Sequence, residues 1–387
     1  MDVIQKLRIL GARAKFDTCA TTFSNRKVNL KNQERIGTPM GACNTFLPDG
    51  RCISVLKVLQ DNRCIHDCAY CVNSVQSNDK IKTGFTSEEL CKLFMSYYLR
   101  NYVSGLFLSS GVCRNSELTM ERMIETIKLL RLKYNFDGYI HLKILPGAPY
   151  EIIKEAASFA DRISVNCEGP NETRFHELTS TKNFKTDILR RMAWIKGLKN
   201  KFKKNDLSQS TQYVVGGANE TDLEIIKMSN WLYDNLEVNR AYYSAFIPVK
   251  GTKLEKQPKI SILREHRLYQ TDWLKRIYKF DFNKEIKLAF DENGFLSQHI
   301  EPKTLIALNS DNKFPIEINN LSYQELLRIP GIGPKSARRI IHFNKKEKIT
   351  RRFQLMRMGA VLKRADPFIK INGKSQKKLF DYFIGMN

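Results

Sequence analysis

The 387-residue chain carries a net charge of +24, is 42% apolar and 10% aromatic, and so has the composition of a basic globular protein. This composition excludes a disordered or fibrous protein, and no apolar run approaches the roughly 20 residues that a membrane-spanning helix needs. Nine cysteines, an odd number, and a charged N-terminal segment are not typical of a secreted disulfide protein. We therefore expect a soluble cytoplasmic protein with no membrane partner and more than one domain.

Residues 1–50 are predicted to form an N-terminal arm that packs on the main domain. Val3, Ile4, Leu7 and Leu10 have helical spacing, and the sequence then becomes rich in Gly, Thr and Asn. Three isolated cysteines fall in or just after this region, at spacings that match no compact metal site. We expect buried thiols there, with an auxiliary metal site as the open alternative, at Cys19, Cys43 and Cys52.

The apolar run Ile53–Leu59 leads into the octapeptide CIHDCAYC, which contains Cys64, Cys68 and Cys71. Structural zinc sites and fully ligated [4Fe-4S] clusters use four protein ligands, and no fourth cysteine follows at short spacing. Three thiolates would leave one iron of such a cluster open. A zinc or iron site closed by a distant Cys or His, or three unlinked core cysteines, is the alternative.

The spacing C-x3-C-x2-C, with Tyr70 before the last cysteine, resembles the radical SAM superfamily. The resemblance implies that Cys64, Cys68 and Cys71 hold a [4Fe-4S] cluster whose open iron binds S-adenosylmethionine. An electron from the cluster would cleave this cofactor and release a 5′-deoxyadenosyl radical. An external electron donor such as flavodoxin or ferredoxin is implied as a partner.

Downstream of residue 51, short β-branched runs alternate with helical patterns, as is typical of a parallel α/β sheet. The predicted strands are Ile53–Leu59, Gly105–Ser109, Tyr139–Leu145, Arg162–Asn166, Gln212–Val215 and Arg240–Phe246. The predicted helices between them are Ser87–Tyr98, Met120–Tyr134, Glu151–Phe159, Lys185–Lys199 and Asp222–Leu236. This α/β pattern is close to a partial (βα)6 barrel, the architecture that the resemblance implies for residues 51–300.

In parallel βα folds the ligand site lies at the carboxyl ends of the strands. Small and polar residues follow several predicted strands, although any single one could be an ordinary turn former. Lys143, Asn166 and Glu168 are candidates for binding the methionyl carboxylate and ribose hydroxyls of S-adenosylmethionine. The resemblance places the segment Ser109–Gly111, after the second predicted strand, at the cofactor's amino group. The full set of predicted cofactor-binding residues is Tyr70, Ser109, Ser110, Gly111, Lys143, Asn166, Glu168 and Gly216.

After a predicted amphipathic helix at 263–278 and a junction at 291–320, the chain becomes strongly basic. Residues 312–387 contain 17 Lys and Arg against 5 Asp and Glu, a net charge of +12, as expected of a module that binds a polyanion. Within them, Leu326–Ile341 places the turn PGIG between two helical patterns. Glycines in such a turn let the backbone present N–H groups to an anion at the start of the next helix.

This pattern resembles the helix-hairpin-helix motif, which contacts nucleic-acid phosphates without reading bases. Met358–Ala365 repeats the frame with Val361 in place of the second glycine, so we expect a degenerate second hairpin. A motif used only for packing or protein contacts is the alternative. The predicted nucleic-acid-binding residues of this small all-α module, residues 301–387, are Gly331, Gly333, Lys335, Ser336, Arg338, Arg339, Lys363 and Arg364.

Three further segments, SSGV after the second strand, YYSAFIP on the sixth and REHRLYQ beyond it, resemble the DNA modification or repair radical SAM family. The resemblance extends from about Arg51 to the C-terminus and implies hydrogen abstraction from a nucleotide in DNA, alongside a uracil-DNA-glycosylase-like partner. Two alternatives stay open: RNA as the substrate, and a non-catalytic DNA-binding protein with a structural or redox-sensing cluster. The sequence assigns no catalytic residue for the step after hydrogen abstraction.

Overall fold

A computed structural model describes residues 1–17, 40–46, 51–201, 207–311 and 313–375. The chain forms two compact units, Met1–Glu220 with Trp231–Ser261 and Thr221–Asn230 with Ile262–Asn387. The second unit thus starts well before residue 301, where the C-terminal module was predicted to begin. None of the helices in the described ranges combines the length and the apolar character that crossing a membrane requires.

The first unit is built on a seven-stranded sheet whose strands are neighbours in chain order. All six predicted strands are confirmed as β2 to β7, and they are parallel. An additional strand, β1, joins the edge antiparallel to β2; the Gly- and Thr-rich composition around it did not indicate a strand. The bounds are β1 (Ala42–Phe46), β2 (Cys52–Leu59), β3 (Gly105–Ser109), β4 (Tyr139–Lys143), β5 (Arg162–Ser164), β6 (Ser208–Val215) and β7 (Arg240–Ala245).

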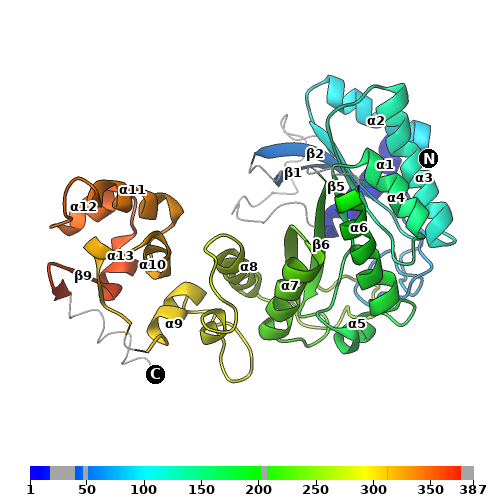
Figure 1. Cartoon of the computed structure of the whole chain (residues 1–387). Helices are drawn as coiled ribbons and strands as arrows, with labels where there is room; N and C mark the ends of the chain where they lie inside the picture. The colour runs from blue at the N-terminus through cyan, green and yellow to red at the C-terminus, as the bar shows by residue number, and fades with distance from the viewer. Residues whose placement is uncertain (18–39, 47–50, 202–206, 312, 376–387) are drawn as a thin grey trace. The chain divides into compact units, whose positions relative to one another are not determined.

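Helices connect the parallel strands, and Figure 1 shows α2, α3, α4 and α6 along one side of the sheet, which curls into a half-barrel. The predicted helix at 185–199 is a π-helical turn, η4, followed by α6, and the short helix α5 was not predicted. The bounds are α2 (Ser87–Leu99), α3 (Ser116–Lys128), η3 (Leu129–Lys133), α4 (Tyr150–Phe159), α5 (Glu172–Leu178), η4 (Phe184–Leu189), α6 (Arg190–Lys201) and α7 (Asp222–Leu236).

Local chemistry fixes where the helices start and the strands pack. The Thr86 hydroxyl accepts the N–H of Glu89, and the Glu89 carboxylate accepts the N–H of Thr86, so a capping box at Thr86 starts α2 at Ser87, as predicted. All eight residues of β6 are buried, as expected of a parallel strand covered on both faces. Because the strands run in one direction, the loops after them meet at one edge, where the candidate site lies.

The N-terminal arm packs on the first unit through α1 (Val3–Arg13) and the 3₁₀ turn η1 (Ala14–Phe16). Leu7 and Leu10 are fully buried, and Lys6 Nζ pairs with a Glu89 carboxylate oxygen at 2.7 Å. The expectation of buried thiols after the arm is wrong for Cys52, which is exposed at the first position of β2, while Cys43 is half-buried. Cys19 lies outside the described residues.

The second unit contains short helices and a small three-stranded sheet, in which β9 pairs with β8 and β10. The prediction of an all-α module is therefore wrong, because two- and three-residue strands leave no alternating pattern in the sequence. The bounds are α8 (Ile262–Arg276), η5 (Ile286–Ala289), α9 (Pro302–Leu308), β8 (Ile316–Glu317), η6 (Ile318–Asn320), α10 (Tyr323–Arg328), α11 (Pro334–Asn344), α12 (Arg352–Arg357), α13 (Leu362–Ala365), η7 (Asp366–Phe368), β9 (Ile369–Ile371) and β10 (Lys374–Ser375).

The predicted apolar face of α8 is only partly correct. Leu268 and Leu274 are buried, but Leu263 and Trp273 are 44% and 45% exposed. Polar residues take part of the buried face instead: Arg264 pairs with Asp222 at 2.7 Å, and Arg276 pairs with Asp272 at 2.6 Å. Helical periodicity alone cannot reveal this, because a buried polar residue becomes tolerable only when a partner lies beside it.

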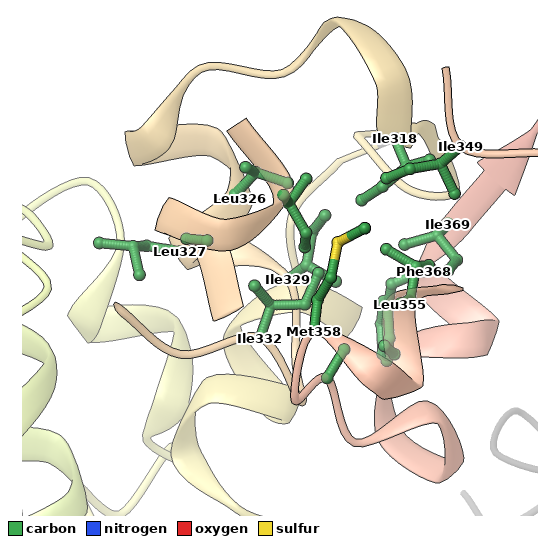
Figure 2. Close-up of a cluster of buried hydrophobic side chains, with 14 of the residues drawn as sticks. Ile318, Leu326, Leu327, Ile329, Ile332, Ile349, Leu355, Met358, Phe368 and Ile369 are labelled. Atoms are coloured by element: carbon green, nitrogen blue, oxygen red, sulfur yellow. The ribbon is translucent and has the colours of Figure 1, made fainter. Parts of the chain in front are cut away.

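One hydrophobic core joins the pieces of the second unit (Figure 2). Leu326 and Leu327 of α10, Leu355 and Met358 near the end of α12, and Phe368 all contribute buried side chains to it. The two helical hairpins α10–α11 and α12–α13 therefore share their apolar faces. Buried residues of all four helices belong to this one core.

Replacing Ile340 of α11, which is fully buried in this core, should destabilise the second unit strongly. We expect Ile340→Ala to cost about 2–5 kcal/mol of unfolding free energy, since the vacated volume cannot fill completely. Urea unfolding followed by circular dichroism would measure this cost. Val361→Ala, at a position 49% exposed, is the control; equal losses in the two variants would contradict the proposed core.

Candidate functional site

The cysteine loop follows β2 and is held by two neighbouring segments. The N–H of Ile65 donates to the carbonyl of Val112 at 2.9 Å, and the N–H of Ala69 donates to the carbonyl of Leu178 at 2.8 Å. Within the loop, the N–H of Cys71 donates to the carbonyl of Cys68 at 3.1 Å. The segment after β3 and the end of α5 thus fix the loop at the carboxyl edge of the sheet.

The three thiols of the loop lie close enough to influence one another. Burial, with smaller contributions from the neighbouring Cys68 and Cys64, raises the pKa of Cys71 to about 12. Burial likewise raises the pKa of Cys64, with a smaller effect from Cys68. Such thiols stay protonated at neutral pH unless positive charge stabilises their thiolates, as a bound metal does.

No three His, Cys, Asp or Glu side chains in the described ranges are grouped so that they could hold a single metal ion. The thiolates of a cubane cluster bind different irons and need not meet at one point. Cys113, two residues beyond Gly111, is not among the main groups that shift the pKa of Cys64 or Cys71. The thiols that shift these pKa values most are those of the cysteine loop itself.

Asp67, between the first two cysteines, ties the loop to the segment after α5. Its carboxylate accepts hydrogen bonds from the hydroxyls of Thr179 and Thr181, at 2.6 and 2.9 Å, and from the N–H of Ser180 at 3.1 Å. Burial alone would raise the pKa of Asp67, but these bonds outweigh it and hold the pKa well below its usual range. Burial, followed by the charge of Lys182, lowers the pKa of the adjacent His66 to about 4, so its ring is neutral.

Lys182 is a site residue that the sequence analysis missed. Burial alone would lower the pKa of Lys182, but Cys68 and Glu168 lie close enough to raise it above the ordinary value. The ammonium also hydrogen-bonds the sulfur of Cys68. Lys182 lies more than a hundred residues after the cysteines in an ordinary polar stretch, so no local pattern could have placed it there.

Gly111 allows the segment after β3 to touch the cysteine loop. A Cβ at this position would lie 2.4 Å from the carbonyl oxygen of Arg63 and 3.2 Å from the Cβ of Cys64. The Gly111 N–H donates to the carbonyl of Asp61 at 2.7 Å, and the Ser110 hydroxyl donates to the same carbonyl at 3.3 Å. Ser109 is buried in β3. The predicted segment thus packs directly against the loop.

Glu168 and Tyr70, both predicted to bind the cofactor, lie near each other and near the cysteines. Burial raises the pKa of Tyr70 well above its usual range, and the Glu168 carboxylate, which the hydroxyl hydrogen-bonds, adds to the effect. Glu168 is buried and has a positive φ of 58°, uncommon for a residue with a side chain. Asn166 is half-buried two residues earlier.

Lys143, which was predicted to bind the methionyl carboxylate of the cofactor, pairs with Asp17 of the arm. Two more strand side chains reach the same segment: Lys57 Nζ donates to the carbonyl of Asp17 at 2.7 Å, and Gln212 Nε2 donates to the carbonyl of Phe16 at 2.8 Å. These side chains come from β4, β2 and β6, so the arm crosses the inside of the curled sheet.

Gly216, the predicted cofactor residue after β6, has a positive φ of 81°. Its N–H donates to the carboxylate of Glu220, and its carbonyl accepts from Gln257 Nε2 at 3.4 Å. The described contacts of Gly216 are therefore those of a tight turn that ends β6.

In the second unit, the turn at Gly331 packs against α13, and the turn at Gly359 packs against α11. A Cβ at Gly331 would lie 2.5 Å from the Val361 carbonyl and 3.0 Å from the Cβ of Arg364; a Cβ at Gly359 would lie 3.3 Å from the Ser336 hydroxyl. Gly331 and Gly359 have positive φ values of 78° and 91°. Each turn thus needs glycine for its own conformation, and Gly331 also for the close approach of its partner.

The predicted phosphate-binding residues of the second unit divide into two groups. Lys335, Arg338 and Lys363 are exposed, and Gly333 directly precedes α11. The others contact neighbouring residues: Ser336 is buried, Arg339 Nη1 donates to the carbonyl of Met358 at 3.4 Å, and Arg364 pairs with Glu301 at 2.9 Å.

Lys303 contacts the PGIG turn of the first hairpin, and the sequence analysis did not identify it. Its ammonium donates to the carbonyl of Ile332, the middle of the PGIG turn, at 2.6 Å and lies 4.8 Å from the centre of the Tyr278 ring. Burial lowers the pKa of Lys303 to about 7, and the charge of Arg328 adds to this effect.

No protein-family model matches the chain, and no curated protein matches it. Solved structures do match at low identity. HydG, a maturase of the [FeFe]-hydrogenase, is 12% identical with a TM-score of 0.43, over 56% of this chain and 48% of that one. Methylornithine synthase (PylB) is 14% identical with a TM-score of 0.44, over 55% and 59%.

OxsB, a cobalamin-dependent S-adenosylmethionine radical enzyme, is 10% identical with a TM-score of 0.36, over 81% of this chain and 52% of that one. The chain thus spans 48% to 59% of the length of these three structures. Identities and TM-scores this low do not transfer a fold or an activity to the chain.

Gly111→Ala should disturb the cysteine loop, because the new methyl group would collide with the Arg63 backbone. We expect a large loss of bound iron after anaerobic reconstitution, measured as iron per chain. Gly197→Ala in α6, where nothing lies within 4 Å of a new Cβ, is the matched control and should retain full iron content. Equal iron content in the two variants would show that the loop does not depend on this close approach.

Proposed function

We propose that the chain is a radical SAM enzyme that holds a [4Fe-4S] cluster and S-adenosylmethionine and abstracts hydrogen from a nucleotide in DNA. The observation that carries the proposal is the group of three mutually interacting thiols at the carboxyl edge of a parallel half-barrel. Such an edge is the general ligand site of parallel βα folds.

The cysteine loop fits a cluster with three protein ligands. Cys64, Cys68 and Cys71 supply the thiolates, and the nearby ammonium of Lys182 offsets part of their negative charge. When bound, the cluster and S-adenosylmethionine would supply a 5′-deoxyadenosyl radical. Asp67 and Gly111 hold the loop so that the three sulfurs keep their positions.

Polar groups at the strand ends suit a zwitterionic cofactor beside the cluster. Lys143 can bind a carboxylate, and Glu168 can accept hydrogen bonds from an ammonium or from ribose hydroxyls. Both side chains are within electrostatic range of each other and of Lys182. The half-barrel interior would exclude water from a reactive radical, as such chemistry requires.

The second unit would bind the nucleic-acid backbone through two helix-hairpin-helix motifs. Exposed Lys335 and Arg338 flank the start of α11, where the helix N-terminus favours an anion. The second hairpin has Val361 at the matching position and pairs Arg364 with Glu301, so it should bind phosphate more weakly. Contacts of this kind carry no base specificity.

Isotope transfer tests the proposed reaction. The reconstituted protein is incubated anaerobically with S-adenosylmethionine, a reductant and deuterium-labelled duplex DNA, and 5′-deoxyadenosine is analysed by mass spectrometry. Deuterium in this product is expected with DNA and not without it. Transfer only from labelled RNA would change the substrate class, and absence of any cofactor cleavage by iron-loaded protein would favour a non-catalytic cluster.

Each cysteine of the loop should be essential for the cluster. We expect Cys64→Ala, Cys68→Ala and Cys71→Ala to lose the [4Fe-4S] absorbance and most of the iron, because two thiolates cannot hold the cubane in place. Alanine at the other cysteines should leave both unchanged, with Cys113 as the most informative control because it lies near the loop. Loss of the cluster from Cys113→Ala would identify a fourth ligand and refute an open iron.

Asp17→Asn should raise the affinity for S-adenosylmethionine. The Asp17 carboxylate already occupies the Lys143 ammonium, so removing its charge leaves that ammonium to the cofactor carboxylate. An ion pair of about 1 kcal/mol corresponds to roughly a fivefold change in dissociation constant, which calorimetry can measure. Asp79→Asn, which frees Arg13 of the same arm, is the control. Unchanged or weaker binding by Asp17→Asn would place Lys143 outside the cofactor site.

A further inference from the structure

A second strongly basic region lies in the first unit, beside the cysteine loop. The loop between β7 and α8, residues 247–261, is closed at its base by the N–H of Ile260, which donates to the carbonyl of Phe246 at 3.0 Å. Its middle is anchored to the cysteine loop, because the N–H of Leu254 donates to the carbonyl of Ala69 at 3.1 Å. Ala69 lies between Cys68 and Tyr70, so this loop borders the candidate site.

Five exposed lysines gather on this loop and on the segment bonded to it. The N–H of Asn78 donates to the carbonyl of Gly251 at 3.0 Å, which joins the segment after the cysteines to the β7–α8 loop. We define the lysine cluster as the exposed residues of these two segments that carry unpaired ammonium groups: Lys80, Lys250, Lys253, Lys256 and Lys259.

The described residues, 1–17, 40–46, 51–201, 207–311 and 313–375, form no ion pair with the lysine cluster. Of the two nearest acids in sequence, Asp79 pairs with Arg13, whereas the Glu255 carboxylate accepts the N–H of Gly251 in the same loop at 2.7 Å, so residues 247–261 keep a net charge of +3. Unpaired charge of one sign at the edge of a site attracts a ligand of the opposite sign.

The composition of the lysine cluster favours a phosphate backbone over a protein partner. Protein interfaces are enriched in Arg and aromatic residues and depleted in Lys. Residues 247–261 contain four lysines and no arginine, tyrosine, tryptophan or phenylalanine. Lysine is a mobile point charge that suits sequence-independent contact with phosphates. Nucleic-acid binding through such contacts depends strongly on the salt concentration.

We propose that the lysine cluster is a second nucleic-acid contact, on the first unit, which holds the phosphate backbone next to the cysteine loop. This inference rests on the proposed function and extends it. The second unit would supply affinity for the backbone in general. The lysine cluster would hold the strand that carries the reacting nucleotide at the opening of the half-barrel, where the cofactor is expected.

The test measures binding by the full chain as a function of salt. Fluorescence anisotropy with labelled duplex DNA, single-stranded DNA and RNA compares wild type with Lys250→Gln/Lys253→Gln/Lys256→Gln. We expect the affinity to fall by about tenfold or more, and the slope of log K against log salt to flatten by about 0.9 for each duplex phosphate that the variant no longer neutralises. The arm of the test with the largest change identifies the form of nucleic acid that the lysine cluster holds.

Two control proteins separate this contact from bulk charge and from misfolding. Gln at Lys92, Lys154 and Lys185, three lysines of α2, α4 and η4 that pair with Glu88, Glu151 and Glu172, removes the same formal charge and should leave affinity and slope close to wild type. Arg at Lys250, Lys253 and Lys256 keeps the charge and should retain binding. Iron content in all variants confirms that the cysteine loop is intact.

Three outcomes would overturn the proposal. If the cluster variant bound DNA and RNA like wild type while Lys335→Gln/Arg338→Gln/Arg339→Gln bound them more weakly, the lysine cluster would have no such role and the proposed function would stand. The lysine variant could instead keep DNA binding while its iron–sulfur cluster is reduced more slowly by an acidic flavodoxin and at an unchanged rate by dithionite. The lysine cluster would then be a docking surface for an electron donor. If wild type bound neither DNA nor RNA, the proposed substrate class would fail as well.

Discussion

The burial of three neighbouring thiols on one loop is the constraint on which the first unit depends. Burial raises the pKa of Cys64 and Cys71, so their thiolates persist only beside positive charge. Lys182 supplies one such charge from the chain itself, and iron would supply the rest. Electrostatic compensation works only over short distances, so the loop must also be rigid. Asp67 provides that rigidity through hydrogen bonds, and Gly111 provides it by allowing backbone contact.

In the second unit, a shared hydrophobic core stabilises helices that are too short to be stable alone. A helix of six residues, such as α10 or α12, cannot persist alone, because nucleation is costly and few bonds follow. Two hairpins that share one core remove that difficulty. The hairpins also differ in charge, since Glu301 partly offsets Arg364 of the second hairpin, while Lys335 and Arg338 of the first are exposed. Any anion bound at the unit should therefore be held mainly by the first hairpin.

The sequence was sufficient to predict the repeated parts of the fold but not its exceptions. Strand and helix periodicities located β2 to β7 and most helices, because many residues contribute to each pattern. The three-residue β9 and the buried polar face of α8 depend on partners distant in the chain, and no local pattern contains them. Lys182 shows the same limit at the site: its importance comes from its proximity to Cys68, which only the folded chain reveals.

The N-terminal arm connects the strands of the half-barrel to the cysteine loop, which the sequence did not indicate. Lys57, Lys143 and Gln212 bind residues 16–17, and Arg13 of the same arm donates to Asn73, two residues after Cys71, at 3.2 Å. A carboxylate ligand that takes Lys143 gains only the difference between its own interaction and the one that Asp17 gives up. The arm thus contacts both Lys143 and the end of the cysteine loop. If exchange at Lys143 shifts the arm, thermodynamic linkage makes the effect reciprocal, and occupation of the cysteine loop would change the affinity of the half-barrel for the arm.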